Sequence, residues 1–132
     1  MKQKIKSISE VLKEHPSVVF AYLFGSRAKQ YANARSDWDV AVYLKDPESK
    51  LNQWPAFELE AELSRTIHQI VQVTILNESL PPLLGFEIVK DGILLVDRNP
   101  NLRTGFENKV MRTFYDWQYF LKRQMESEGF TS

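Results

Sequence analysis

The sequence contains no cysteine among its 132 residues, which excludes disulfide bonds and thiolate zinc sites together. Any bound metal would therefore need oxygen ligands or the two histidines, His15 and His68. These histidines lack the spacing of a ligand pair, so neither is assigned to a metal. The absence of cysteine also suits a reducing compartment, and we predict a cytoplasmic protein.

Long hydrophobic runs are missing as well. The longest apolar stretch, residues Val18–Phe24, is far shorter than the roughly 20 residues that cross a bilayer. The basic N-terminal residues lead into alternating polar and apolar positions, not into the apolar region of a signal peptide. We therefore expect no membrane association.

An excess of charge is also absent, because 17 basic residues balance 17 acidic ones. Bulk nucleic-acid binding depends on basic residues that neutralise phosphates, so direct nucleic-acid binding is not expected. A small phosphorylated ligand needs only local positive charge and is compatible with this composition.

What is present is enough apolar material for one compact domain, with 43% hydrophobic and 12% aromatic residues. Residues 1–98 are predicted to pack as this domain, and residues 99–132 to form a C-terminal helix of the same single-domain chain. Hydrophobic spacing predicts helices over 3–14, 55–68 and 81–90, and strands over 18–24, 38–44, 71–76 and 93–97. This alternation predicts an α/β or α+β domain with one small mixed sheet, flanked by helices and covered mainly on one side.

The C-terminal segment is rich in aromatic residues. Residues 98–105 are interpreted as a connector, after which Thr104 and Glu107 fit a capping box that begins a long helix. The apolar positions at helical spacing are Phe106, Val110, Phe114, Trp117 and Leu121, with Phe120 beside them. Such a stripe suits packing on the domain or a surface for a partner or a second copy, and we favour the surface.

One motif carries most of the functional information: Gly25-Ser26, ten residues, then Asp37-Trp38-Asp39. Side chains alternate along a strand, so the two carboxylates face one side, roughly 7 Å apart along the backbone, while Trp38 points away into the core. Such a pair suits Mg²⁺, which prefers oxygen ligands and is commonly completed by nucleotide phosphates.

The glycine and serine of the motif follow a predicted strand. Glycine allows close backbone approach, and backbone amides with the Ser26 hydroxyl can hold phosphate oxygens. Three cations lie nearby in the sequence, Arg27, Lys29 and Arg35, and are interpreted as solvated surface residues.

The segments YLFGSRA (22–28) and SDWDVAV (36–42) resemble those of the DNA polymerase β-like nucleotidyltransferases, especially the minimal nucleotidyltransferases. The resemblance covers roughly residues 15 to 97. It implies the polymerase β-like fold and a transferase that moves AMP from ATP to an acceptor hydroxyl with two Mg²⁺ ions. Asp37 and Asp39 would then be catalytic metal ligands, and Gly25 and Ser26 would bind the nucleotide.

Small stand-alone chains of this type resemble the MntA antitoxins, which are paired with HEPN-domain ribonuclease toxins. The resemblance implies AMPylation of the toxin, on a tyrosine, and a possible hetero-oligomer of the two proteins. A chain with no evident substrate-recognition domain would take its acceptor from such a partner.

One position departs from the family pattern. The next strand usually carries a third acidic residue, where this chain has Gln72, whose neutral amide cannot accept a proton. Three explanations stay open: two aspartates suffice, another carboxylate such as Glu78 or Asp91 substitutes, or the domain binds nucleotide and does little chemistry. Two alternatives stay open: an antitoxin that inhibits its toxin by binding alone, and a transferase that modifies a small-molecule hydroxyl.

Overall fold

The computed structural model describes residues 2–29, 37–45 and 54–129, and their elements follow the predicted order. The helices are α1 (Lys2–Lys13), α2 (Ser26–Lys29), α3 (Trp54–Ile67), α4 (Pro82–Asp91) and α5 (Pro100–Ser127). The strands are β1 (Val18–Phe24), β2 (Trp38–Leu44), β3 (Val71–Ile75) and β4 (Ile93–Asp97). The mixed α/β fold class is confirmed. None of the helices within these ranges is both long and apolar enough to cross a membrane.

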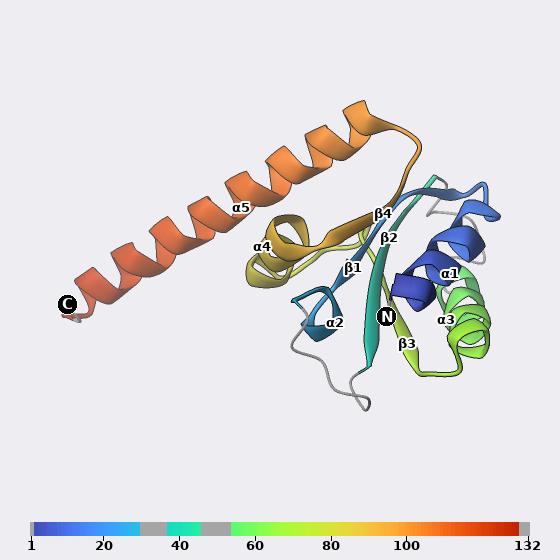
Figure 1. Cartoon of the computed structure of the whole chain (residues 1–132). Coiled ribbons are helices and arrows are strands. Elements are labelled where there is room, and N and C mark those ends of the chain that lie inside the picture. Colours follow the sequence, from blue (N-terminus) through green and yellow to red (C-terminus); the bar gives the residue numbers. More distant parts are fainter. Residues whose placement is uncertain (1, 30–36, 46–53, 130–132) are drawn as a thin grey trace.

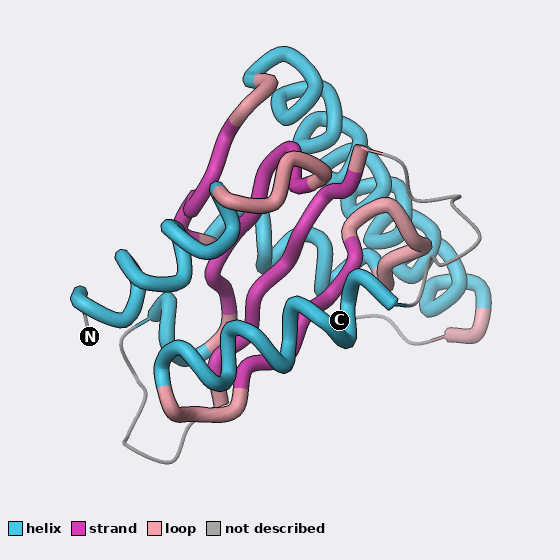
Figure 2. Tube along the Cα trace, turned by 90° about the vertical axis from the view of Figure 1, so that its right-hand side faces the viewer, coloured by secondary structure: helices cyan, strands magenta, loops and turns pink. Residues whose placement is uncertain are grey.

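The strands of the described ranges form one four-stranded mixed sheet in the order β3-β2-β1-β4 (Figure 2). β1 runs antiparallel to both β2 and β4, whereas β2 and β3 are parallel and are connected through α3. Two register pairs matter for function: Phe24 lies opposite Asp39, and Asp39 lies opposite Gln72. The end of β1 therefore meets the starts of β2 and β3 at one edge of the sheet.

Helices cover both faces of the sheet, with α1 and α3 on one side and α4 and α5 on the other (Figure 1). The prediction that helices cover mainly one face of the sheet was wrong. Its physical reason lies in β1, where both alternating sets of side chains are apolar, so each face needs a packing partner. On the α1 side the core contains Ile8, Leu23, Trp38, Val40 and Leu63; on the α4 side it contains Phe20, Tyr22, Ala41, Leu76 and Ile88.

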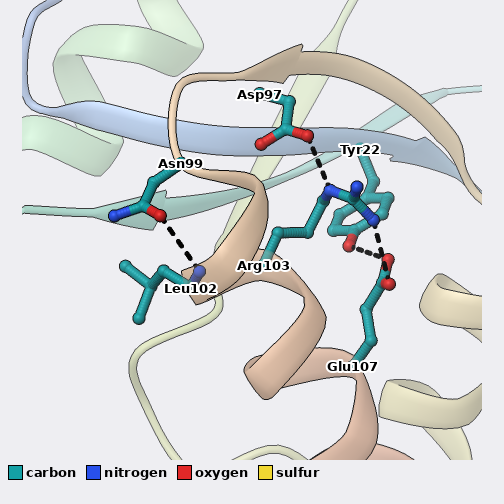
Figure 3. Close-up of polar contacts among 6 residues, drawn as sticks. All are labelled: Tyr22, Asp97, Asn99, Leu102, Arg103 and Glu107. Atoms are coloured by element: carbon teal, nitrogen blue, oxygen red, sulfur yellow. Dashed lines mark hydrogen bonds and ion pairs between the residues drawn. The ribbon is translucent and has the colours of Figure 1, made fainter.

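The last helix begins earlier than the capping-box interpretation predicted. Asn99 is the N-cap, and its side-chain oxygen accepts a hydrogen bond from the backbone N–H of Leu102 at 3.1 Å (Figure 3). Pro100 follows at the first helical position, where its missing N–H costs nothing. Asn99 and Pro100 already form the N-terminus of the helix, so the helix begins before Thr104. Residues 98–105 are therefore not a connector, and Glu107 lies inside the helix.

The helix α5 packs on the domain through its first half only. Phe106 contacts the rings of Phe20 and Tyr43, and Phe114 stacks on Phe86 with ring centroids 3.9 Å apart. Beyond this point α5 extends away from the sheet (Figure 1). The large apolar side chains exposed along this distal half are Tyr115, Tyr119, Phe120, Leu121 and Met125. Internal packing therefore accounts for only part of the aromatic stripe.

Candidate active site

A glycine turn connects β1 to the short helix α2. Gly25 has φ +77°, a left-handed conformation that side chains disfavour, and its carbonyl accepts the backbone N–H of Lys29 to close α2. A Cβ atom at this position would lie 2.7 Å from Oδ2 of Asp39. Glycine is therefore required here for two reasons, backbone conformation and the close approach of a carboxylate.

Asp37 and Asp39 lie at the start of β2, on the opposite side of the sheet from the buried Trp38 and Val40. Asp37 is exposed and Asp39 is half-buried. Burial raises the pKa of the Asp39 carboxyl, and the negative charge of Asp37 raises this pKa further. The structure thus brings together Gly25, Asp37 and Asp39, with Ser26 as the half-buried first residue of α2.

These residues form a plausible donor set for a divalent cation. Asp37 and Asp39 would hold such a cation, because two carboxylates that repel each other gain stability when a cation neutralises their charge. Two ligands leave most of the coordination sphere to water and nucleotide phosphates, which is how Mg²⁺ is commonly bound.

Among the residues that the structure describes, no third carboxylate is assembled beside this pair. Gln72 lies next to Asp39 in the parallel ladder, and its Nε2 donates a long hydrogen bond of 3.4 Å to Oδ2 of Asp37. Across the described ranges, no three His, Cys, Asp or Glu side chains form a group that could hold a metal. The neutral amide of Gln72 therefore occupies the position where the resemblance implies an acid.

The two substitute acids differ in location. Glu78 follows Asn77, whose side chain bonds both backbone groups of Leu44, so Glu78 is at the far end of β2 from the aspartates. Asp91 ends α4 near Ile93, which pairs with Leu23 close to the glycine turn. Its carboxylate lies 3.6 Å from Nζ of Lys29. Of the two acids, only Asp91 is at the same edge as the motif.

Arg27 is buried, contrary to its interpretation as a solvated residue. Its side chain is 8% exposed, and its guanidinium carbon lies 4.7 Å from the ring centroid of the buried Trp38. Cation–π contacts of this kind contribute about 2 kcal/mol or more when the cation is desolvated. Lys29 is exposed, as predicted, and Arg35 lies outside the described residues.

The two histidines take no part in the site. His15 lies at the end of α1, with Nε2 2.7 Å from Oε2 of Glu62 on α3. His68 follows α3 with a positive φ of 57°. Neither is placed beside the aspartates.

A polar network that the sequence analysis missed fastens α5 to the sheet (Figure 3). The Tyr22 hydroxyl donates to Glu107 at 2.5 Å, and Arg103 donates to Glu107 at 3.0 Å and to Asp97 at 2.8 Å. Burial raises the pKa of Tyr22, and the hydrogen bond to Glu107 raises it further. The i, i+4 spacing of Arg103 and Glu107 indicates their ion pair, whereas the sequence contains no signal for their partners on β1 and β4.

The comparisons with known proteins concern the family and the fold. The family described as "Polymerase beta, Nucleotidyltransferase" matches residues 6–101, so the chain belongs to this nucleotidyltransferase family. No curated protein matches the chain.

Similar folds occur in solved toxin–antitoxin structures. A crystal structure of a toxin–antitoxin with AMP-PNP aligns with TM-score 0.74 and 22% identity, covering 93% of this chain and 96% of that one. The toxin–antitoxin MntA–HepT gives TM-score 0.71, 20% identity and coverage of 96% and 97%. A tri-AMPylated Shewanella oneidensis HEPN toxin in complex with an MNT antitoxin aligns with TM-score 0.69 and 22% identity, covering 96% of this chain and 98% of that one. At these identities the likeness concerns the fold.

Proposed function

We propose that this chain is an antitoxin-type, Mg²⁺-dependent nucleotidyltransferase that transfers AMP from ATP to a tyrosine hydroxyl of a cognate HEPN ribonuclease toxin and so inhibits it. The observation that carries the proposal is the contact between the Gly25 turn and the Asp39 carboxylate, with Asp37 on the same side of the strand. Membership of the nucleotidyltransferase family and the fold shared with toxin–antitoxin structures support it.

Each motif residue has a role in this reaction. Asp37 and Asp39 hold the cations, and Gly25 and Ser26 bind the triphosphate. When bound, a pair of Mg²⁺ ions neutralises charge on the attacking and leaving oxygens. The acceptor oxygen forms a bond to the α-phosphorus, the α–β anhydride bond breaks and pyrophosphate leaves. The Gln72 amide accepts no proton, so in this proposal the proton of the acceptor hydroxyl passes to water or to Asp91, the carboxylate at the same edge.

The partner would bind the distal half of α5. Its exposed rings, Tyr119 at 64% and Phe120 at 56%, continue beyond the part that packs on α4. Aromatic side chains are common energetic anchors of protein interfaces. A hetero-oligomer with the toxin would cover these side chains.

Transfer of radiolabel from α-labelled ATP to a cognate HEPN protein tests the proposal. The wild-type chain with Mg²⁺ is expected to label the HEPN protein, and Asp39→Asn to reduce labelling by at least a hundredfold, because one metal-binding charge is lost. Glu58→Gln removes a charge from an exposed position on α3 and serves as the matched control. Equal labelling by Asp39→Asn and the control would contradict the assignment.

A second candidate is an antitoxin that inhibits by binding alone, favoured by the neutral Gln72 beside Asp39. Protection of cells that express the toxin distinguishes inhibition by binding alone from inhibition by AMP transfer. The double variant Asp37→Asn, Asp39→Asn retains protection if binding alone suffices, and loses it if AMP transfer is required.

A further inference from the structure

Arg27 lies between two parts of the motif that are distant in sequence. It directly follows Ser26, and its guanidinium lies over the ring of Trp38, the residue between Asp37 and Asp39. The contact therefore joins the glycine turn to the strand that carries the carboxylates.

Trp38 is held firmly enough to transmit this contact. Its side chain is fully buried, and its indole N–H donates to Oε1 of Gln69 at 3.0 Å. Its backbone N–H donates to the carbonyl of Ile70 at 3.1 Å. Ring face, ring edge and backbone are thus each fixed, so the orientation of the neighbouring aspartates depends on how Trp38 is packed.

Arg27 and the two aspartates lie on opposite sides of the sheet, so Arg27 does not contact the proposed metal ligands directly. Trp38 packs with Val40 and Leu63 in the core beneath α1 and α3, and strand alternation places Asp37 and Asp39 on the opposite side. A guanidinium over the Trp38 ring is therefore behind the carboxylates. A phosphate ligand would need to reach the carboxylate side.

We propose that Arg27 is a positioning residue, which acts through Trp38 to fix the two aspartates relative to the glycine turn and is not a phosphate ligand. The inference rests on the proposed function of this motif. In this role, the buried cation of Arg27 supports metal binding even when no nucleotide is bound.

Titration of the full chain with Mn²⁺ alone separates these roles, because no phosphate is present. Arg27→Met, which keeps the length of the side chain but removes the planar cation, is expected to bind Mn²⁺ about tenfold more weakly than wild type. Arg112→Met removes an exposed cation of α5, remote from the glycine turn, and should leave Mn²⁺ affinity unchanged. Unchanged affinity in Arg27→Met, with weaker ATP binding only, would overturn the proposal.

Arg27→Lys distinguishes a stacked guanidinium from a simple positive charge. Lysine keeps the charge but not the planar group that stacks on an indole, so Mn²⁺ affinity should be only partly restored. Full recovery of both Mn²⁺ and ATP binding would contradict a role through Trp38. This variant also covers the case in which Arg27→Met fails to fold.

Hydrogen exchange of the Trp38 and Asp39 backbone amides measures the positioning role without requiring catalysis. Arg27→Met should accelerate this exchange at least severalfold, whereas Arg112→Met should not. If wild type neither binds Mn²⁺ nor transfers label while the exchange difference persists, the proposed function fails and the positional contact stands. If exchange is the same in all variants, the positioning role itself is wrong.

Discussion

At the scale of single residues, the site depends on one missing side chain, that of Gly25. Gly25→Ala would place a Cβ 2.7 Å from Oδ2 of Asp39 and force an alanine to adopt φ +77°. We expect a loss of about 1–3 kcal/mol in the free energy of unfolding, together with weaker metal binding, because the carboxylate must move. Urea denaturation and Mn²⁺ titration measure the two effects. Wild-type values for both would show that the close approach is unimportant.

The neutral side chain of Gln72 gives a second prediction. Gln72→Asp would place a third carboxylate beside Asp39. Without metal, like-charge repulsion should lower the melting temperature, whereas Mg²⁺ should raise it by more than it does in wild type. Gln72→Asn is the matched neutral control. An equal Mg²⁺-induced shift in both variants would contradict a metal site at this edge.

The placement of the motif residues could be predicted from the sequence because it depends on local geometry, while their roles in binding and catalysis stay predictions. Strand alternation alone places Asp37 and Asp39 on one side, opposite Trp38. The burial of Arg27 could not be predicted in this way, because a cation after a glycine turn usually lies in solvent. Only the three-dimensional position of Trp38 provides the aromatic face that compensates its desolvation.

At the scale of the elements, most helices and strands could be predicted because their apolar spacing is regular. The start of α5 could not, since two capping signals compete. Thr104 and Glu107 fit a capping box, but Asn99 and Pro100 come first and satisfy the helix. Glu107 is then free to accept the Tyr22 hydroxyl on β1, a contact between residues far apart in sequence.

The junction between α5 and the sheet should respond to alkaline pH. Tyr22 faces Glu107 and Arg103 on α5, with Asp97 of β4 bound to Arg103, and its pKa is raised on folding. Tyr22→Phe should cost about 1 kcal/mol at pH 8 by loss of the hydrogen bond.

The sign of the pH effect follows from the raised pKa. Above about pH 10 the unfolded tyrosine ionises while the folded one stays protonated, so its contribution to stability falls as pH rises. The difference between wild type and Tyr22→Phe should therefore narrow between pH 9 and 11. Urea denaturation at both pH values measures it, and a constant or growing difference would contradict the assignment.

At the scale of the whole molecule, the fold separates the edge that carries Gly25, Asp37 and Asp39 from a projecting helix (Figure 1). The proximal half of α5 covers Phe20 and Tyr43, whereas the distal half leaves Tyr119 and Phe120 exposed. The motif's family resemblance predicts a HEPN toxin as the partner, whereas the aromatic residues alone do not, because exposed aromatic residues specify an interface and not its occupant.

The double variant Tyr119→Ser, Phe120→Ser tests this surface without disturbing the packed half of α5. Its melting temperature should stay within a few degrees of wild type, because both side chains are exposed. Binding to the HEPN protein should weaken at least tenfold, since aromatic anchors commonly contribute more than 1 kcal/mol each. Gel filtration of the chain alone distinguishes loss of self-association. Unchanged partner binding would place the interface elsewhere.

The central claim is that the edge formed by Gly25, Asp37 and Asp39 transfers AMP to a partner protein. Intact-mass spectrometry of the cognate HEPN protein, after incubation with this chain, ATP and Mg²⁺, tests it most directly. We predict a mass increase by whole AMP units, lost with Asp39→Asn, and fragmentation of the modified peptide should locate the AMP on tyrosine. A stable complex whose HEPN protein keeps its unmodified mass would contradict the claim.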